Sequence, residues 1–172
     1  LILAHLFFGS YMMAFVFAPE YIQWYIARKE LPEDFRFLKR GLQYLQWQFY
    51  NGKQRPWVLK NPVYPGFEPL LATIFPDAAF VTTHRAPHSI LPSGISLLHY
   101  YHQAYSDVSH KEQLGMMLYE GHAMVLQAHM AARDANPQLN ILDIGYGESA
   151  ANAEHAVEEI HAHAGMTLSA QA

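Results

Sequence analysis

The chain has 172 residues, a length typical of one domain, and its 51% hydrophobic and 15% charged residues exclude a disordered chain. Its formal net charge of −4 provides no overall positive field for nucleic acid, and its lack of cysteine excludes disulfides, a thiolate nucleophile and cysteine metal ligands. We therefore expect one domain over residues 1–172, no nucleic-acid partner and, from the absence of cysteine, a cytoplasmic location.

The first 18 residues form an apolar run whose length reaches the lower limit of a membrane span. His5, Gly9 and Ser10 interrupt this run, and no Lys or Arg flanks it as an anchor would require. We expect a buried helix and no transmembrane span. A membrane anchor is the alternative, and solubility without detergent would argue against it. Because the first residue is Leu, we expect the chain to be a fragment of a longer protein.

Helical patterns and short apolar runs alternate through the rest of the chain. Apolar residues at three- and four-residue spacing predict helices, whereas short apolar runs bounded by turns predict strands. The first predicted helix begins at Pro19 and is broken at Leu31-Pro32. The others cover residues 33–50, about 66–75, 88–105, 111–135 and about 152–164. We expect Pro92 to bend the 88–105 helix or to mark its start, and Ser109 to be the N-cap of the 111–135 helix. The predicted buried strands are residues 57–59, 78–82 and 139–144. This alternation predicts an α/β fold with a parallel sheet and helices on both faces.

A polar or turn-forming pair follows each predicted strand: Lys60-Asn61, His84-Arg85 and Tyr146-Gly147. Because the carboxyl ends of parallel strands share one edge, we expect the Lys, the Arg and the Tyr to meet at one crevice, where such sheets bind ligands.

Arg85 stands where a strand leads into a helix, and it can grip a phosphate with two hydrogen bonds while the helix N-terminus favours an anion. Ser93, eight residues further on, can donate one more hydrogen bond. These residues predict a phosphate pocket. The alternative is that Arg85 is only a salt-bridge partner and Ser93 an ordinary helix serine.

Five segments, in their order and spacing, resemble the bacterial sulfotransferases that use 3′-phosphoadenosine 5′-phosphosulfate. They are Leu42-Gln43-Tyr44-Leu45-Gln46-Trp47, Trp57-Val58-Leu59-Lys60-Asn61-Pro62, Phe75-Pro76-Asp77-Ala78, Thr83-His84-Arg85-Ala86-Pro87 with Pro92-Ser93, and Asp143-Ile144-Gly145-Tyr146. The resemblance covers residues from about Tyr21 to Leu168. It implies a P-loop-kinase-like sheet flanked by helices, here incomplete, helix-rich and with about three core strands.

The resemblance also implies an activity, the transfer of a sulfuryl group from that nucleotide to a hydroxyl or amine of a small or lipid-like acceptor, without a metal. By position, Arg85 and Ser93 would hold the 3′-phosphate and Tyr146 would lie beside the adenine. Lys60 would stabilise charge on the bridging oxygen as its bond to sulfur breaks.

Three departures from the family pattern bear on catalysis. Ala86 replaces an acidic residue that is common in the family. Tyr64 stands where the family commonly has a histidine, and because a tyrosine is a poor base at neutral pH, the identity of the catalytic base is left open. The family's Gly-rich loop and C-terminal segment have no counterpart, so we expect impaired transfer. The alternative is a non-catalytic, sulfotransferase-like binding or interaction module. Apolar surface exposed by missing segments would favour self-association.

The chain contains 11 histidines, which raise the alternative of a metal site. His99 and His102 are three residues apart, and His122 and His129 are two helical turns apart. No HExxH pattern and no completing acid accompany them, so we expect histidines of the helix surface or core and no metal. A zinc titration would distinguish these readings.

Overall fold

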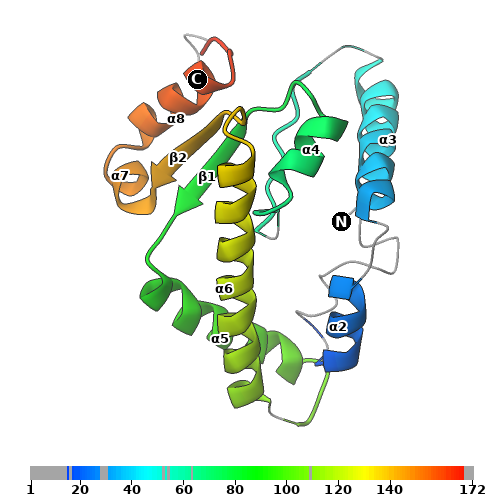
Figure 1. The fold of residues 1–172 in the computed structure, drawn as a ribbon, viewed down its shortest axis with the longest axis vertical. Helices are drawn as coiled ribbons and strands as arrows, with labels where there is room; N and C mark the ends of the chain where they lie inside the picture. Colours follow the sequence, from blue (N-terminus) through cyan, green and yellow to red (C-terminus); the bar gives the residue numbers. More distant parts are fainter. Residues whose placement is uncertain are drawn as a thin grey trace. The chain divides into compact units, whose positions relative to one another are not determined.

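The structure is a computed structural model, and it describes residues 15, 17–27, 31–51, 53, 55–62, 64–108 and 110–168. The chain falls into two compact units, the first comprising Leu1–Tyr64 and Gly94–His122 and the second Pro65–Ser93 and Ala123–Ala172. Two long helices, α5 (Pro87–Gln103) and α6 (Lys111–Ala135), contribute residues to both units (Figure 1).

The first unit contains α2 (Pro19–Ala27) and α3 (Leu31–Tyr50). Helix α3 begins two residues earlier than predicted, and Pro32 is tolerated because the N–H groups of a first turn have no partner inside the helix. The residues Phe35, Leu38 and Leu42 of α3 are buried at three- and four-residue spacing, which confirms an amphipathic helix, but Phe49 at the end of the predicted apolar face is 67% exposed. The helix ends where Asn51 adopts a positive φ of 49°.

The second unit contains a two-stranded parallel sheet and the helices around it. Strand β1 (Phe80–His84) pairs with β2 (Ile141–Gly145), with Phe80 opposite Ile141 and His84 opposite Gly145. A parallel pair requires a long connection, and the residues of α5 and α6 lie between the two strands in sequence. The unit is completed by α4 (Glu68–Ile74), α7 (Tyr146–Ala151) and α8 (Ala153–His163), and α7 and α8 contact β2 (Figure 1).

The prediction of a parallel α/β sheet is confirmed for two strands and wrong for the third. Residues 57–59 form no strand in the described part of the chain, and the side chain of Val58 is 87% exposed. An apolar run becomes a buried strand only where neighbouring strands take up its backbone hydrogen bonds, and the described sheet contains only β1 and β2. The expectation that the 78–82 strand is fully buried is also wrong, because Val81 is 37% exposed.

The helix boundaries agree closely with the predicted ones. Helix α6 covers the predicted residues 111–135, and α8 differs from its prediction by one residue at each end. Helix α5 begins at Pro87 and contains Pro92, so Pro92 does not mark its start. Helix α7 stands where only a turn was predicted.

Two of the sequence predictions fall largely outside the described residues. They are the helix over residues 1–18, of which only residues 15, 17 and 18 are described, and the N-cap at Ser109. Within the part of the chain that is described, no helix is both long and apolar enough to cross a bilayer.

Gly66 is required by the way the chain approaches α6 within the second unit. Its φ is +93°, and a Cβ added there would lie 2.8 Å from the Cβ of Ala128. A side chain would therefore meet both backbone strain and a steric clash. This close approach places the start of α4 against the C-terminal half of α6.

Candidate functional site

The paired ends of β1 and β2 bring two of the predicted site residues together. Because His84 lies opposite Gly145, the residues that follow them, Arg85 and Tyr146, leave the sheet at the same edge. The carbon at the centre of the Arg85 guanidinium lies 4.5 Å from the centre of the Tyr146 ring, which is a cation–π contact. The predicted meeting of these two strand ends is therefore confirmed.

The guanidinium of Arg85 is held at two points and remains exposed. Its Nε donates a hydrogen bond to the Ser89 hydroxyl (3.1 Å), and its face lies on the Tyr146 ring. Among the described residues, the two terminal nitrogens have no hydrogen-bond partner. They form the edge that binds a phosphate or a carboxylate through two parallel hydrogen bonds.

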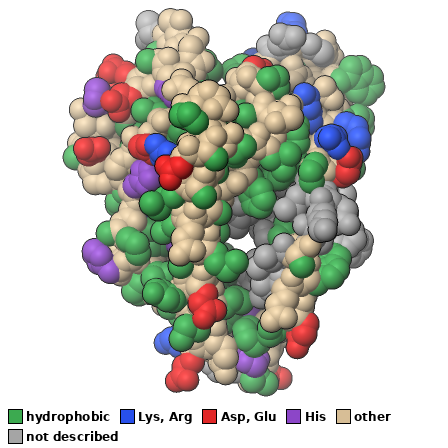
Figure 2. Space-filling view, viewed as in Figure 1, with side chains coloured by type: hydrophobic (Ala, Val, Ile, Leu, Met, Phe, Trp, Pro, Cys, Tyr) green, Lys and Arg blue, Asp and Glu red, His purple; other side chains and the backbone are tan. Residues whose placement is uncertain are grey.

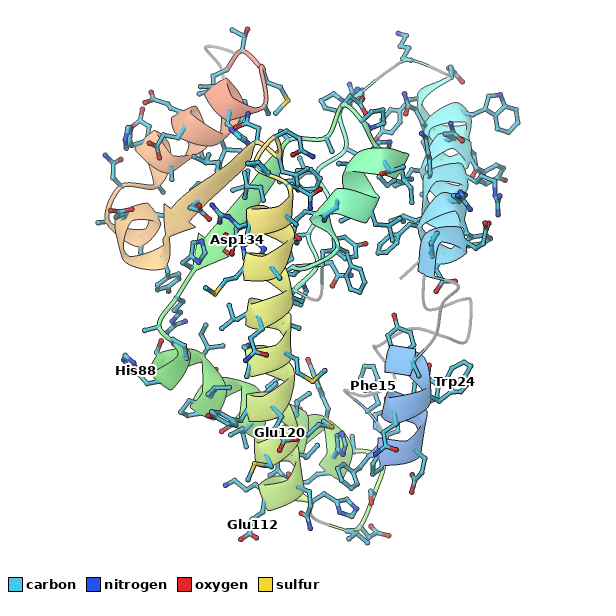
Figure 3. All side chains as sticks on the ribbon, viewed as in Figure 1. Phe15, Trp24, His88, Glu112, Glu120 and Asp134 are labelled. Atoms are coloured by element: carbon cyan, nitrogen blue, oxygen red, sulfur yellow. The ribbon has the colours of Figure 1, made fainter. Side chains whose placement is uncertain are left out.

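The start of α5 fixes the position of Ser89. Pro87 is the first residue of the helix, a position that suits proline because no helical partner exists there for an N–H group. The Ala86 carbonyl accepts hydrogen bonds from the Ser89 hydroxyl (2.8 Å) and from the backbone N–H groups of Ser89 and Ile90. The Ser89 hydroxyl thus joins the first turn of α5 to Arg85. Figure 3 shows His88 pointing away from the helix in this turn.

A second group of polar residues lies beside this edge. Arg133 of α6 donates two hydrogen bonds to Asp143 of β2, from Nη1 to Oδ1 (2.8 Å) and from Nη2 to Oδ2 (2.6 Å). His84 of β1 donates from Nε2 to the same Oδ1 (2.6 Å). The hydrogen bonds from Arg133 hold the pKa of Asp143 well below its usual range, against the opposing effect of burial, and the hydrogen bond from His84 adds to the lowering. Figure 2 shows basic, acidic and histidine side chains side by side in this region.

A buried pair continues this network into the core. His129 and Glu68 are only 4% and 5% exposed, and His129 Nδ1 lies 2.6 Å from Glu68 Oε1. The other Glu68 oxygen accepts the Gly66 N–H (2.7 Å). Arg133 Nη1 lies 3.5 Å from His129 Nε2, and a guanidinium can only donate. The hydrogen bonds therefore place the His129 proton on Nδ1, where it is donated to the Glu68 carboxylate.

Of the remaining predicted residues, Ser93 lies in the second unit and makes no hydrogen bond to this edge among the described residues, whereas Lys60 and Tyr64 lie in the first unit. Ser93 is exposed and lies one turn beyond Ser89 on α5. Lys60 is exposed, and Tyr64 is half-buried with its ring 5.7 Å from that of Phe35, in an edge-on contact. Lys60 and Tyr64 belong to the first unit, and Lys60 follows no strand there, so the prediction that a third strand end carries a lysine is wrong.

The sequence analysis missed Ser89, Arg133 and Asp143. A signal for Asp143 was present, because it is a charged residue inside an otherwise apolar strand. Nothing in the sequence pattern pairs it with Arg133 on a helix or with His84 on another strand. Within the described residues, no group of three or more His, Asp or Glu side chains could hold a metal ion.

This edge can bind an anion next to a flat ring. Arg85 offers a fixed guanidinium edge, and the Tyr146 ring, which is 51% exposed, offers a surface for stacking. A nucleotide carries both a phosphate and a flat base, so these residues fit one end of a nucleotide.

A model of the sulfotransferase family matches residues 3–170, and the chain therefore belongs to this family. No curated protein and no solved structure gives a significant match. Membership assigns the chain to proteins that transfer sulfuryl groups, and it confirms the resemblance found in the sequence.

Proposed function

We propose that the chain binds 3′-phosphoadenosine 5′-phosphosulfate at the edge formed by Arg85 and Tyr146, for transfer of its sulfuryl group to a hydroxyl or amine of a small or lipid-like acceptor. The observation that carries the proposal is the Arg85 guanidinium, held by Ser89 and Tyr146 with its terminal nitrogens exposed. In this proposal those nitrogens bind the 3′-phosphate and Tyr146 contacts the adenine.

Ser93 completes the phosphate site in the proposal. It follows Ser89 by four residues, so both hydroxyls lie on the same face of α5. The first turn of α5 adds the positive end of the helix dipole. Arg85, Ser93 and the helix dipole, three sources of attraction for a phosphate, then come from the nine consecutive residues 85–93, which supports a single site.

The transfer step assigns Lys60 to the departing oxygen. The acceptor oxygen or nitrogen bonds to sulfur in line with the sulfur–oxygen bond that breaks and gives up its proton to solvent, while the electron pair of the broken bond stays on the phosphate oxygen. A lysine beside this oxygen stabilises the developing negative charge. Tyr64 is the residue proposed near the acceptor. Its packing on Phe35 gives it a structural role as well.

Calorimetric titration with two ligands tests the phosphate site. The ligands are 3′,5′-adenosine bisphosphate and adenosine 5′-monophosphate, which differ only in the 3′-phosphate. We expect the first to bind more tightly, and we expect Arg85→Ala to weaken it by about tenfold to a hundredfold while leaving the monophosphate nearly unchanged, because a hydrogen bond to a charged group is worth about 1.5–3 kcal/mol.

Arg55→Ala is the matched control, because Arg55 also lies on a tyrosine ring, that of Tyr50 at 5.0 Å, but in the first unit. Equal affinity of the unchanged chain for both ligands would refute the 3′-phosphate site. Transfer of labelled sulfate from the nucleotide to a phenolic acceptor then tests turnover. Binding without transfer would favour the non-catalytic module.

A further inference from the structure

We propose that Arg133, Asp143 and His84 act as a strand-end clamp, whose function is to position Arg85 and Tyr146 for ligand binding. This proposal rests on the function proposed above and assigns positioning residues to the same site. None of the three is assumed to touch the ligand. The clamp joins α6, β2 and β1 within the second unit.

The clamp is linked to the site through very short stretches of backbone. His84 is the last residue of β1 and directly precedes Arg85, while Asp143 precedes Tyr146 by three residues. Thr82 lies opposite Asp143, so His84 and Asp143 are diagonal neighbours on the same face of the sheet. Their hydrogen bond (2.6 Å) therefore ties together the two strand ends from which Arg85 and Tyr146 emerge.

The two strand ends need such a tie because the described sheet has only two strands. In a larger sheet, neighbours on both sides fix the end of each strand, whereas within the described part of the chain β1 and β2 pair only with each other. The cation–π contact between Arg85 and Tyr146 lies just beyond the last paired residues, His84 and Gly145. Its geometry depends on how closely the strand ends are held.

The clamp itself is fixed at its outer end. Arg133 donates two parallel hydrogen bonds to the Asp143 carboxylate, and such a pair fixes orientation as well as distance. The same guanidinium reaches His129, whose other ring nitrogen is bonded to the buried Glu68. Asp143 is therefore held against the core of the unit, and its hydrogen bond with His84 restrains the end of β1 in turn.

Arg133→Met tests the clamp because methionine keeps most of the aliphatic length and loses both hydrogen bonds. We expect the affinity for 3′,5′-adenosine bisphosphate to fall about tenfold, the size of effect seen when residues that orient a binding group are removed. We expect Arg133→Lys, which keeps the charge but not the two parallel bonds, to recover part of the loss. Arg36→Met is the matched control, because Arg36 pairs with Glu33 on α3 of the first unit, and its affinity should equal that of the unchanged chain.

A second measurement judges the clamp without any ligand. The Tyr146 ring shifts the NMR signals of the Arg85 side-chain protons through its ring current, and Tyr146→Leu shows how large this shift is. We expect Arg133→Met to remove most of the shift at temperatures where the protein is folded, whereas a residue that only stabilises the fold would lower the unfolding temperature and leave the shift unchanged. Retention of the full shift in Arg133→Met overturns the clamp.

The two measurements separate failure of the clamp from failure of the proposed function. If the unchanged chain binds the bisphosphate and Arg133→Met binds it equally well, the clamp is overturned and the proposed function stands. If the unchanged chain does not bind the bisphosphate, the proposed function fails, and the ring-current shift alone decides whether the clamp positions Arg85.

Discussion

Replacement of Glu68 by alanine is the sharpest test of the buried network. The Glu68 side chain is 5% exposed, and its two oxygens accept hydrogen bonds from His129 Nδ1 (2.6 Å) and from the Gly66 N–H (2.7 Å). Alanine removes both acceptors at once. Two donors are then left without their acceptor, one on the buried His129 and the other the part-buried Gly66 N–H.

The expected cost follows from these two donors. A buried donor without a partner costs about 1–3 kcal/mol, and the cost lies toward the upper end when the lost partner was a charged group such as this carboxylate. We therefore expect Glu68→Ala to lower the free energy of unfolding by about 3–5 kcal/mol, a large part of the about 5–15 kcal/mol by which domains are stable. Glu68→Gln keeps one oxygen acceptor, so its loss should lie between those of the unchanged chain and Glu68→Ala.

Urea unfolding followed by circular dichroism measures this cost. With a denaturant slope of about 2 kcal/mol per molar, the midpoint should fall by about 1.5–2.5 M. Glu33→Ala is the control, because Glu33 forms an exposed pair with Arg36 and its loss should be nearly neutral. If Glu68→Ala unfolds at the same urea concentration as Glu33→Ala, the reasoning about buried acceptors is refuted.

Three further predictions concern the second unit. Because the pKa of Asp143 is lowered in the folded state, its ionised form stabilises the fold at pH values above the unfolded pKa of about 3.9. This stability is lost as the pH falls toward the folded pKa, so the urea midpoints of Asp143→Asn and of the unchanged chain should differ above about pH 4 and converge in stronger acid. Gly66→Ala should cost about 2 kcal/mol or more, since the new Cβ combines a φ of +93° with a contact of 2.8 Å to Ala128; an unchanged melting temperature would contradict this. His163→Phe removes the donor to the Phe80 carbonyl (3.0 Å) and should cost about 1 kcal/mol, with faster hydrogen exchange in β1; unchanged exchange there would argue against the bond.

The long helices were predictable from the sequence because their signals are local. The apolar spacing of α3 and the 25-residue pattern of α6 repeat over several turns, and the boundaries are marked by Asn51 and by Asn136-Pro137. Each residue in such a segment contributes to the same preference, so the sum is clear even without knowledge of what the helix packs against.

The strands were less predictable because a strand depends on its partner. Residues 57–59 have the composition of a buried strand, yet Val58 is 87% exposed and no described strand pairs with them. The apolar runs that end at His84 and at Gly145 have no stronger strand signal in the sequence, yet they form β1 and β2. All three runs are short and mainly apolar, and the presence of a neighbouring backbone decides which of them becomes a strand.

The features of the candidate site also differ in whether the sequence alone could predict them. The sequence by itself determined the sulfotransferase family, the positions of Arg85 and Tyr146 after their strands, and the start of a helix beyond Arg85, because these depend on residue types at fixed spacing. Only the tertiary structure decided that Ser89 holds Arg85 and that Arg133, Asp143 and His84 join three elements. Hydrogen bonds between residues far apart in the chain depend on the direction and distance of side chains after packing, and no local pattern carries that information.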